Sequence, residues 1–187
     1  MTATDVVLIA LVVAVVWAAY AFNRLVALRE RCDNGWSQID VQLRRRHDLI
    51  PNLVETVKGY AAHERELFER VTVARTRGVD ARSVGDQADA ERAIGAGLRQ
   101  LFAVAEAYPA LKADASFLAL QEELSGTESK IAYARQFYND QVMRLNTRIQ
   151  SFPSTVIARM FGFTEREFFE IDDDARGPVA VSFGGEA

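Results

Sequence analysis

The sequence has few of the residues that build disulfides and metal sites. Its 187 residues include one cysteine, Cys32, and two histidines. A single thiol cannot form an internal disulfide, which agrees with a reducing compartment. His47 and His63 are sixteen positions apart, so on one continuous helix they lie more than about 20 Å apart and cannot bind the same ion. We expect no metal site and no cofactor, and a surface or capping role for both histidines.

Motifs typical of enzymes are also missing. The sequence contains no glycine-rich phosphate loop and no serine nucleophile elbow. His63-Glu64 does not form a zinc-protease motif, because Leu67 stands where the second histidine is needed. We therefore expect a protein that is not an enzyme.

A basic surface is absent as well. The chain has 22 basic and 26 acidic side chains, a formal net charge of -4 and a pI near 5.3. Nucleic-acid phosphates require a positive face, and the triplet Arg44 to Arg46 is too short to provide one. We expect no nucleic-acid partner.

One long apolar run is present, from Val6 to Phe22. As a helix it spans about 25 Å, close to the thickness of a bilayer core. Trp17 and Tyr20 near its end suit a membrane interface. The run predicts a transmembrane helix in contact with the bilayer through residues 6–22. A secretory signal peptide and a buried soluble helix are weaker alternatives, since the segment before the run lacks basic residues.

The flanking charges predict the orientation of this helix. No lysine or arginine precedes the run, whereas Arg24, Arg29 and Arg31 follow it closely. Cytoplasmic flanks of membrane helices are enriched in these residues. We expect a single-pass protein of the cell's inner membrane, with its N-terminus outside and its C-terminal domain in the cytoplasm.

Heptad repeats predict an all-α fold for the remainder. Apolar residues recur every three and four positions from Cys32 to Ala74, and a second series recurs every seven. Such spacing is typical of coiled-coil packing. The second series consists of Phe117, Leu124, Ile131, Tyr138, Leu145 and Phe152. It predicts a long helix that begins after Pro109 and ends near Ser151, and a shorter helix is expected over residues 86–107.

Pro51 interrupts the first series, and two outcomes remain open. Either one kinked helix runs from the membrane to about Arg77, or Asp48 caps a second helix with Pro51 in its first turn. The preserved register favours near-continuity. Together the patterns predict three parts: an anchor over residues 1–23, an elongated antiparallel bundle of about four helices over residues 24–170, and a disordered acidic tail over residues 171–187.

The region before the tail has its own signals. A short helix is expected from Ser154 to Phe161, closed by Gly162. Thr164 to Glu167 has a capping-box pattern, which predicts another helical turn that presents Phe168 and Phe169 to the bundle or to a protein partner.

Two charged residues fall inside the first heptad series, Arg46 and Glu64. A buried ion needs an opposite charge. Glu128 or Glu122 is available for Arg46, and Arg135 or Arg144 for Glu64. These residues form either internal register pairs or, in the case of Arg46 together with Asn139 and Asn146, a polar binding groove. The candidate interaction positions are Arg46, Glu64, Asn139, Asn146, Phe168 and Phe169.

The stretch from Ile39 to Ala61, IDVQLRRRHDLIPNLVETVKGYA, closely resembles the signature of the bacterial LemA family. The resemblance extends over about residues 22–170. It includes His63-Glu64, Tyr108-Pro109, Phe137-Tyr138-Asn139, Asn146, Phe152-Pro153-Ser154 and Phe168-Phe169-Glu170. The resemblance implies a short outer N-terminus, one membrane helix and a helical bundle with no established biochemical activity.

Three classes of function are compatible with these patterns. The first is a membrane-tethered scaffold or adaptor that binds an unidentified protein partner at the bacterial inner membrane. The second is a structural homo-oligomer without a separate partner. The third, with the least support from the residues, is a ligand sensor or an enzyme.

Overall fold

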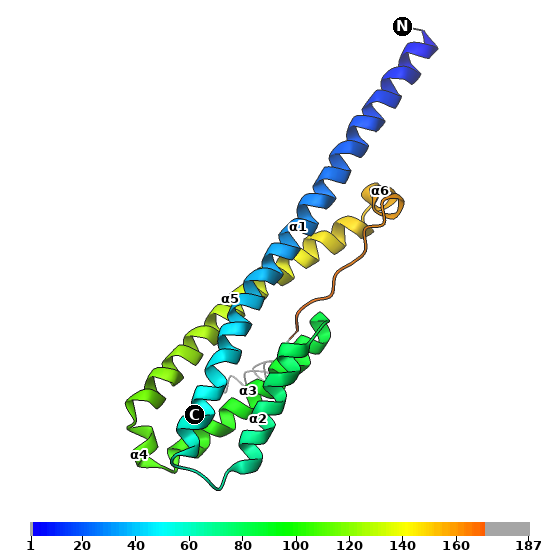
Figure 1. Cartoon of the computed structure of the whole chain (residues 1–187). Helices are drawn as coiled ribbons and strands as arrows, with labels where there is room; N and C mark the ends of the chain where they lie inside the picture. The colour runs from blue at the N-terminus through cyan, green and yellow to red at the C-terminus, as the bar shows by residue number, and fades with distance from the viewer. Residues whose placement is uncertain (1, 171–187) are drawn as a thin grey trace, which may run out of the picture.

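The computed structural model describes residues 2–170, and within this range every regular element is a helix (Figure 1). The elements are α1 (Ala3–Lys58), α2 (Arg65–Asp80), α3 (Val84–Glu106), α4 (Pro109–Lys112), α5 (Ala115–Gln150) and α6 (Ser154–Met160). The all-α prediction is confirmed. The predicted tail over residues 171–187 lies outside the described residues.

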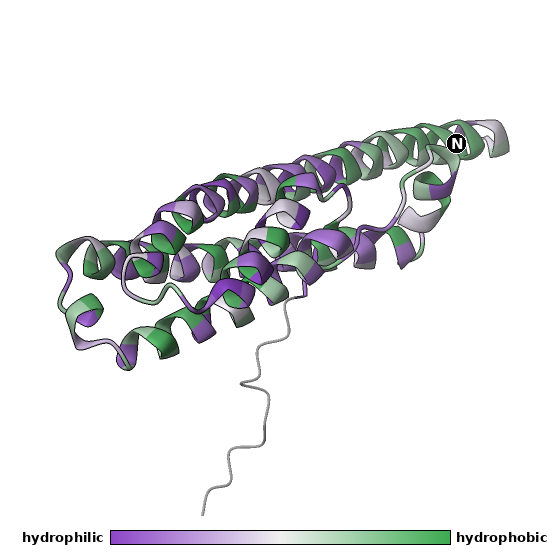
Figure 2. Cartoon of the chain, turned by 60° about the horizontal axis from the view of Figure 1, so that its bottom comes forward, coloured by the Kyte–Doolittle hydropathy of each residue, from purple (hydrophilic) through white to green (hydrophobic). Residues whose placement is uncertain are grey.

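The two longest helices form the frame of the molecule. α1 and α5 pack against each other in opposite directions, and α2 and α3 form a hairpin beside the distal half of α1 (Figure 1). α6 packs against both α1 and α5 near the point where α1 leaves the bundle. Beyond this point the N-terminal part of α1 projects alone, and Figure 2 shows that its residues are apolar. The predicted boundary at residue 23 falls within α1.

The heptad residues form most of the core. Ile39 and Leu53 of α1 and Ile131 and Leu145 of α5 are almost completely buried. One cluster of buried side chains lies between α1, α5 and α6, and a second joins α1 to α2, α3 and the start of α5. Phe152 is an exception, because it follows the end of α5 and is exposed.

α1 continues without a break through Pro51 and ends at Lys58. The prediction of near-continuity is confirmed, but the expected extension to Arg77 is wrong, as is the alternative start at Asp48. The chain turns over residues 59–64 before α2 begins. Proline at position 51 has no N–H for the carbonyl of His47, four residues earlier. Nε of Arg75 on α2 donates a hydrogen bond to this carbonyl at 2.7 Å.

The start of α5 is set by an acidic cap. The Asp114 side chain accepts hydrogen bonds from the backbone N–H groups of Ser116 and Phe117. The preceding Pro109–Lys112 turn is therefore a separate element, α4, and the long helix begins at Ala115 rather than directly after Pro109. The Phe117 N–H bond, followed by a hydrogen bond from the Tyr60 hydroxyl, lowers the pKa of Asp114, and the same contact with Asp114 raises the pKa of Tyr60.

The C-terminal part is helical only as far as α6. α6 ends before Gly162, whose φ of 68° is the left-handed conformation that glycine adopts readily. This end was predicted. The helical turn predicted at Thr164 to Glu167 is wrong, because residues 163–170 have no helical structure. We call residues 163–170 the C-terminal strap; it runs back along the bundle from α6 towards the α2–α3 hairpin (Figure 1).

Candidate functional site

Two asparagines of α5 hold the C-terminal strap. Asn139 donates a hydrogen bond from Nδ2 to the carbonyl of Phe169 at 3.1 Å and accepts one from the Phe169 N–H at 2.9 Å. Asn146 makes the same pair of bonds with the backbone of Arg166, both at 2.9 Å. Each side-chain amide thus pairs with one strap residue as a neighbouring β-strand would. These four bonds hold Arg166 and Phe169 of the strap against α5.

Side chains strengthen this attachment. The Tyr138 hydroxyl donates to the carbonyl of Glu167 at 2.9 Å, and burial raises the pKa of Tyr138 to about 12. The ring of Phe169 is fully buried and packs edge-on against Trp36, with 5.3 Å between ring centroids. Phe168 is exposed. Asn139 and Asn146 therefore bind the chain's own strap, of which the buried Phe169 is a part, and their side-chain amides are occupied by strap backbone rather than open to a groove.

Arg46 is the centre of a buried charge cluster. Its guanidinium contacts Glu91 of α3, with 3.2 Å between Nη1 and Oε2, and Glu128 of α5, with 2.9 Å between Nη2 and Oε2. The side chains of Arg46 and Glu91 are 5% and 0% exposed. The pair with Glu128 was predicted and the pair with Glu91 was not. Since the three residues lie on three helices, this cluster fixes the α2–α3 hairpin on the α1–α5 frame.

His47 belongs to the same cluster. Its Nε2 lies 2.7 Å from Oε1 of Glu91, which also accepts a hydrogen bond from Nε2 of Gln87 at 3.0 Å. The surface role predicted for His47 is wrong, because this side chain is buried. Both carboxylate oxygens of Glu91 have partners within the chain. The cluster therefore resembles a buried polar network that fixes how the helices pack, rather than a site open to a substrate.

Glu64 has a different role from the one expected. It lies between α1 and α2, where its carbonyl accepts hydrogen bonds from Leu67 and Phe68 at the start of α2. Within residues 2–170 its carboxylate forms no ion pair with Arg135 or Arg144. The reason is that α1 ends before residue 64 and the chain turns at the tip of the bundle.

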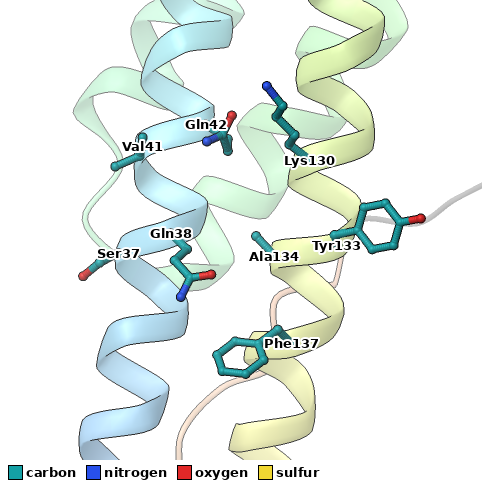
Figure 3. Close-up of a pocket in the computed structure, with 8 residues that line it drawn as sticks. All are labelled: Ser37, Gln38, Val41, Gln42, Lys130, Tyr133, Ala134 and Phe137. Carbon is teal, nitrogen blue, oxygen red and sulfur yellow. The ribbon is translucent and has the colours of Figure 1, made fainter.

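The α1–α5 frame has an uncovered surface on the side opposite the α2–α3 hairpin, α6 and the strap. Figure 3 shows a groove between these helices, with the α2–α3 hairpin and the strap behind them. Its volume is about 640 Å³. The lining residues are Ser37, Gln38, Val41 and Gln42 of α1 and Lys130, Tyr133, Ala134 and Phe137 of α5. We call this surface the open groove.

The open groove combines apolar and polar contacts. The side chain of Tyr133 is 77% exposed, and Val41 and Phe137 are exposed as well. Oε1 of Gln42 is buried in the groove and has no hydrogen-bond partner among the described residues, which is unfavourable for an amide oxygen. Lys130 adds one positive charge. The groove can accept a largely apolar surface.

The sequence patterns did not identify the open groove. Tyr133 and Phe137 are four positions apart, and they lie on the face of α5 away from the one that Asn139 and Asn146 occupy. The sequence feature that could have indicated the groove is this pair of aromatic residues, which are four positions apart and outside the heptad series. No set of three His, Cys, Asp or Glu side chains suited to a metal ion occurs in the part of the chain that the structure describes.

Sequence comparisons match most of the chain to known proteins. The profile of the LemA family matches residues 35–183. "Magnetosome protein MamQ 2" and "Magnetosome protein MamQ 1" of Paramagnetospirillum magneticum are each 26% identical over 175 residues, covering 80% of this chain and 64% of theirs. "Magnetosome protein MamQ" of Magnetospirillum gryphiswaldense is 24% identical over 174 residues, covering 79% of this chain and 64% of its own. The chain thus spans less than two thirds of these relatives.

Proposed function

Because the chain belongs to the LemA family, we propose that it is a membrane-tethered scaffold whose open groove binds a helical segment of another protein. The anchor is the N-terminal part of α1, and the proposed location is the bacterial inner membrane, with the bundle in the cytoplasm. The proposal assigns the protein no catalytic step.

The exposure of α1 supports the anchor. One helix among the described residues, α1, is long and apolar enough to cross a membrane. Its apolar side chains at Val6, Val12 and Val16 are each more than half exposed, because no other element covers this part of the helix. Exposed apolar area on this scale is unfavourable in water and favourable in a bilayer.

The shape of the bundle supports a helical partner. α1 and α5 form a two-helix layer that is covered on one face by the hairpin, α6 and the strap. A third helix that lies along the open groove would contact both α1 and α5, as helices in bundles do. The exposed aromatic rings of Tyr133 and Phe137 are suited to such a contact. This groove is the observation that carries the proposal.

The relatives do not indicate which partner the open groove binds. Their names associate them with magnetosomes, and this chain matches 64% of their length. Residues outside the matched part could supply their specific role, so the proposal for this chain depends on α1 and the open groove.

Photo-crosslinking in native membranes tests the proposal. A benzophenone amino acid replaces Tyr133 in the full chain, and the matched control carries it at Val79, an exposed apolar residue of α2. We expect one dominant adduct with another protein from position 133 and none from position 79. Equal yields from both positions would contradict a specific groove, and an adduct with a second copy of the chain would show the homo-oligomer instead.

A further inference from the structure

α6 and the residues beside it expose an apolar face that no element of the bundle covers. The side chains of Phe152 and Met160 are 84% and 66% exposed, and Val156 is also exposed. Val156 and Met160 are four positions apart and therefore lie on one side of α6, and Phe152 lies just before the start of this helix. The opposite side, with Ile157 and Ala158, is buried against the bundle. We call Phe152, Val156 and Met160 the apolar foot.

The apolar foot lies at the same level as the end of the apolar run in α1. The ring of Phe161, directly after α6, contacts the ring of Phe22, the last residue of that run, with 4.7 Å between centroids. Phe163 packs against Phe22 as well. A bilayer that surrounds residues 6–22 therefore has its surface beside α6.

A groove with three arginines lies at the same end of the bundle. It has a volume of about 460 Å³ and is lined by Arg24 of α1, Arg144 and Arg148 of α5, and Tyr20 and Met143 among other residues. None of the three guanidinium groups forms an ion pair with a carboxylate of the described residues. Nε of Arg148 is buried and has no hydrogen-bond partner among them. We call this the arginine groove.

Unpaired arginines beside exposed apolar side chains fit one chemistry, that of an anionic phospholipid. Guanidinium groups form paired hydrogen bonds with phosphate oxygens, while Tyr20 and Met143 offer contacts to an acyl chain. A soluble phosphate compound would not require the apolar foot. The presence of both cationic and apolar exposed groups at one end of the bundle is typical of interfacial membrane contacts.

We infer that this end of the bundle docks on the membrane surface, with the apolar foot in the lipid interface and the headgroup phosphate of an anionic phospholipid in the arginine groove. The inference depends on the proposed anchor in α1. It adds a second membrane contact, which holds the α1–α5 frame at a fixed height and angle to the bilayer.

Fluorescence quenching in vesicles tests the position of the foot. The full chain is reconstituted in phosphatidylcholine and phosphatidylglycerol vesicles, with a fluorophore on a cysteine introduced at Met160, at Val12 or at Val79. The native Cys32 is buried and remains unlabelled. We expect brominated lipids to quench the labels at positions 160 and 12 but not the label at 79. Quenching at 12 without quenching at 160 would overturn this inference alone, and quenching at neither would overturn the anchor too.

Lipid binding tests the arginine groove. Native mass spectrometry measures phosphatidylglycerol retained by the full chain in detergent. Arg24→Gln with Arg144→Gln should weaken retention on the order of fivefold per arginine, and phosphatidylcholine retention should not change. The control with Arg65→Gln and Arg77→Gln, two exposed arginines of α2, should retain phosphatidylglycerol as the natural chain does. Equal retention by both double variants would overturn the arginine groove as a lipid site.

Discussion

The guanidinium of Arg75 donates a hydrogen bond to the carbonyl of His47, the position in α1 whose helical donor is removed by Pro51. A proline inside a helix leaves the carbonyl four residues earlier without its amide partner and usually causes a kink or a break. Here a side chain from α2 replaces the missing amide. This contact explains how α1 extends as one element from the apolar run to the tip of the bundle.

The contact predicts coupling between positions 75 and 51. Arg75→Leu should lower the free energy of unfolding by about 1 to 3 kcal/mol, because a buried carbonyl loses its donor. In a Pro51→Ala background the amide of residue 51 can bond to His47, so the same substitution should cost less. Chemical denaturation of the natural chain, the two single variants and the double variant measures the coupling. Additive losses would show that Arg75 does not compensate for the proline.

The buried cluster predicts a large effect of Arg46→Leu. This change leaves Glu91 buried without its cation, so we expect a loss of about 3 to 5 kcal/mol in the free energy of unfolding. Arg45→Leu removes an exposed ion pair with Glu123 and should cost less than about 1 kcal/mol. Thermal melting of both variants makes the comparison. Similar melting temperatures for the two would mean that the Arg46 pair adds no more than a surface contact.

Close approach of α1 and α5 predicts opposite outcomes for two glycines. A Cβ at Gly35 would lie 3.2 Å from Cα of Tyr138, a backbone atom that cannot move without shifting α5. Gly35→Ala should therefore destabilise the bundle by roughly 1 to 3 kcal/mol. Gly126→Ala meets no atom within 4 Å and should stabilise α5 by about 0.5 to 1 kcal/mol. Stabilisation by both substitutions, measured by denaturation, would contradict the close contact at Gly35.

The cap of α5 predicts a dependence of stability on acid pH. The pKa of Asp114 is lowered from its ordinary value of 3.8, so the folded state favours the ionised carboxylate. Its contribution is fully present above pH 3.8 and is lost as the pH falls through the lowered pKa. Asp114→Asn keeps a capping oxygen but does not titrate. The stability advantage of the natural chain over this variant should shrink below pH 3.8; a constant advantage from neutral to acid pH would refute the role of the charge.

The heptad series predicted α5 well, because Phe117, Leu124 and Ile131 bury one stripe of a continuous helix. The same reasoning misplaced the end of α1. Leu67 and Ala74 keep the register of the first series although they belong to α2, so the apolar pattern alone did not reveal the turn between them. The turn over residues 59–64 contains no proline and a single glycine, so its sequence gives little indication that a helix ends there.

Polar contacts between distant segments were harder to predict than the helices. Arg46 was identified as a buried charge in need of a partner, but Glu91 could be found only once α3 was placed against α1. Asn139 and Asn146 were identified as members of a polar face, but their partner, the strap, has no periodicity in its sequence that indicates where it lies. The open groove depends on what the other helices leave uncovered, and this is a property of the assembled fold.

The central claim is that the uncovered side of the α1–α5 frame is the surface through which the anchored protein binds its partner. Its most direct measurement is the amount of partner that a benzophenone amino acid at Val41, an exposed residue of the open groove, crosslinks in native membranes when the chain also carries Tyr133→Glu or, for comparison, Val79→Glu on α2. We predict that Tyr133→Glu abolishes recovery and leaves the melting temperature unchanged, because its side chain is exposed, and that Val79→Glu has no effect. Full recovery with Tyr133→Glu would contradict the account.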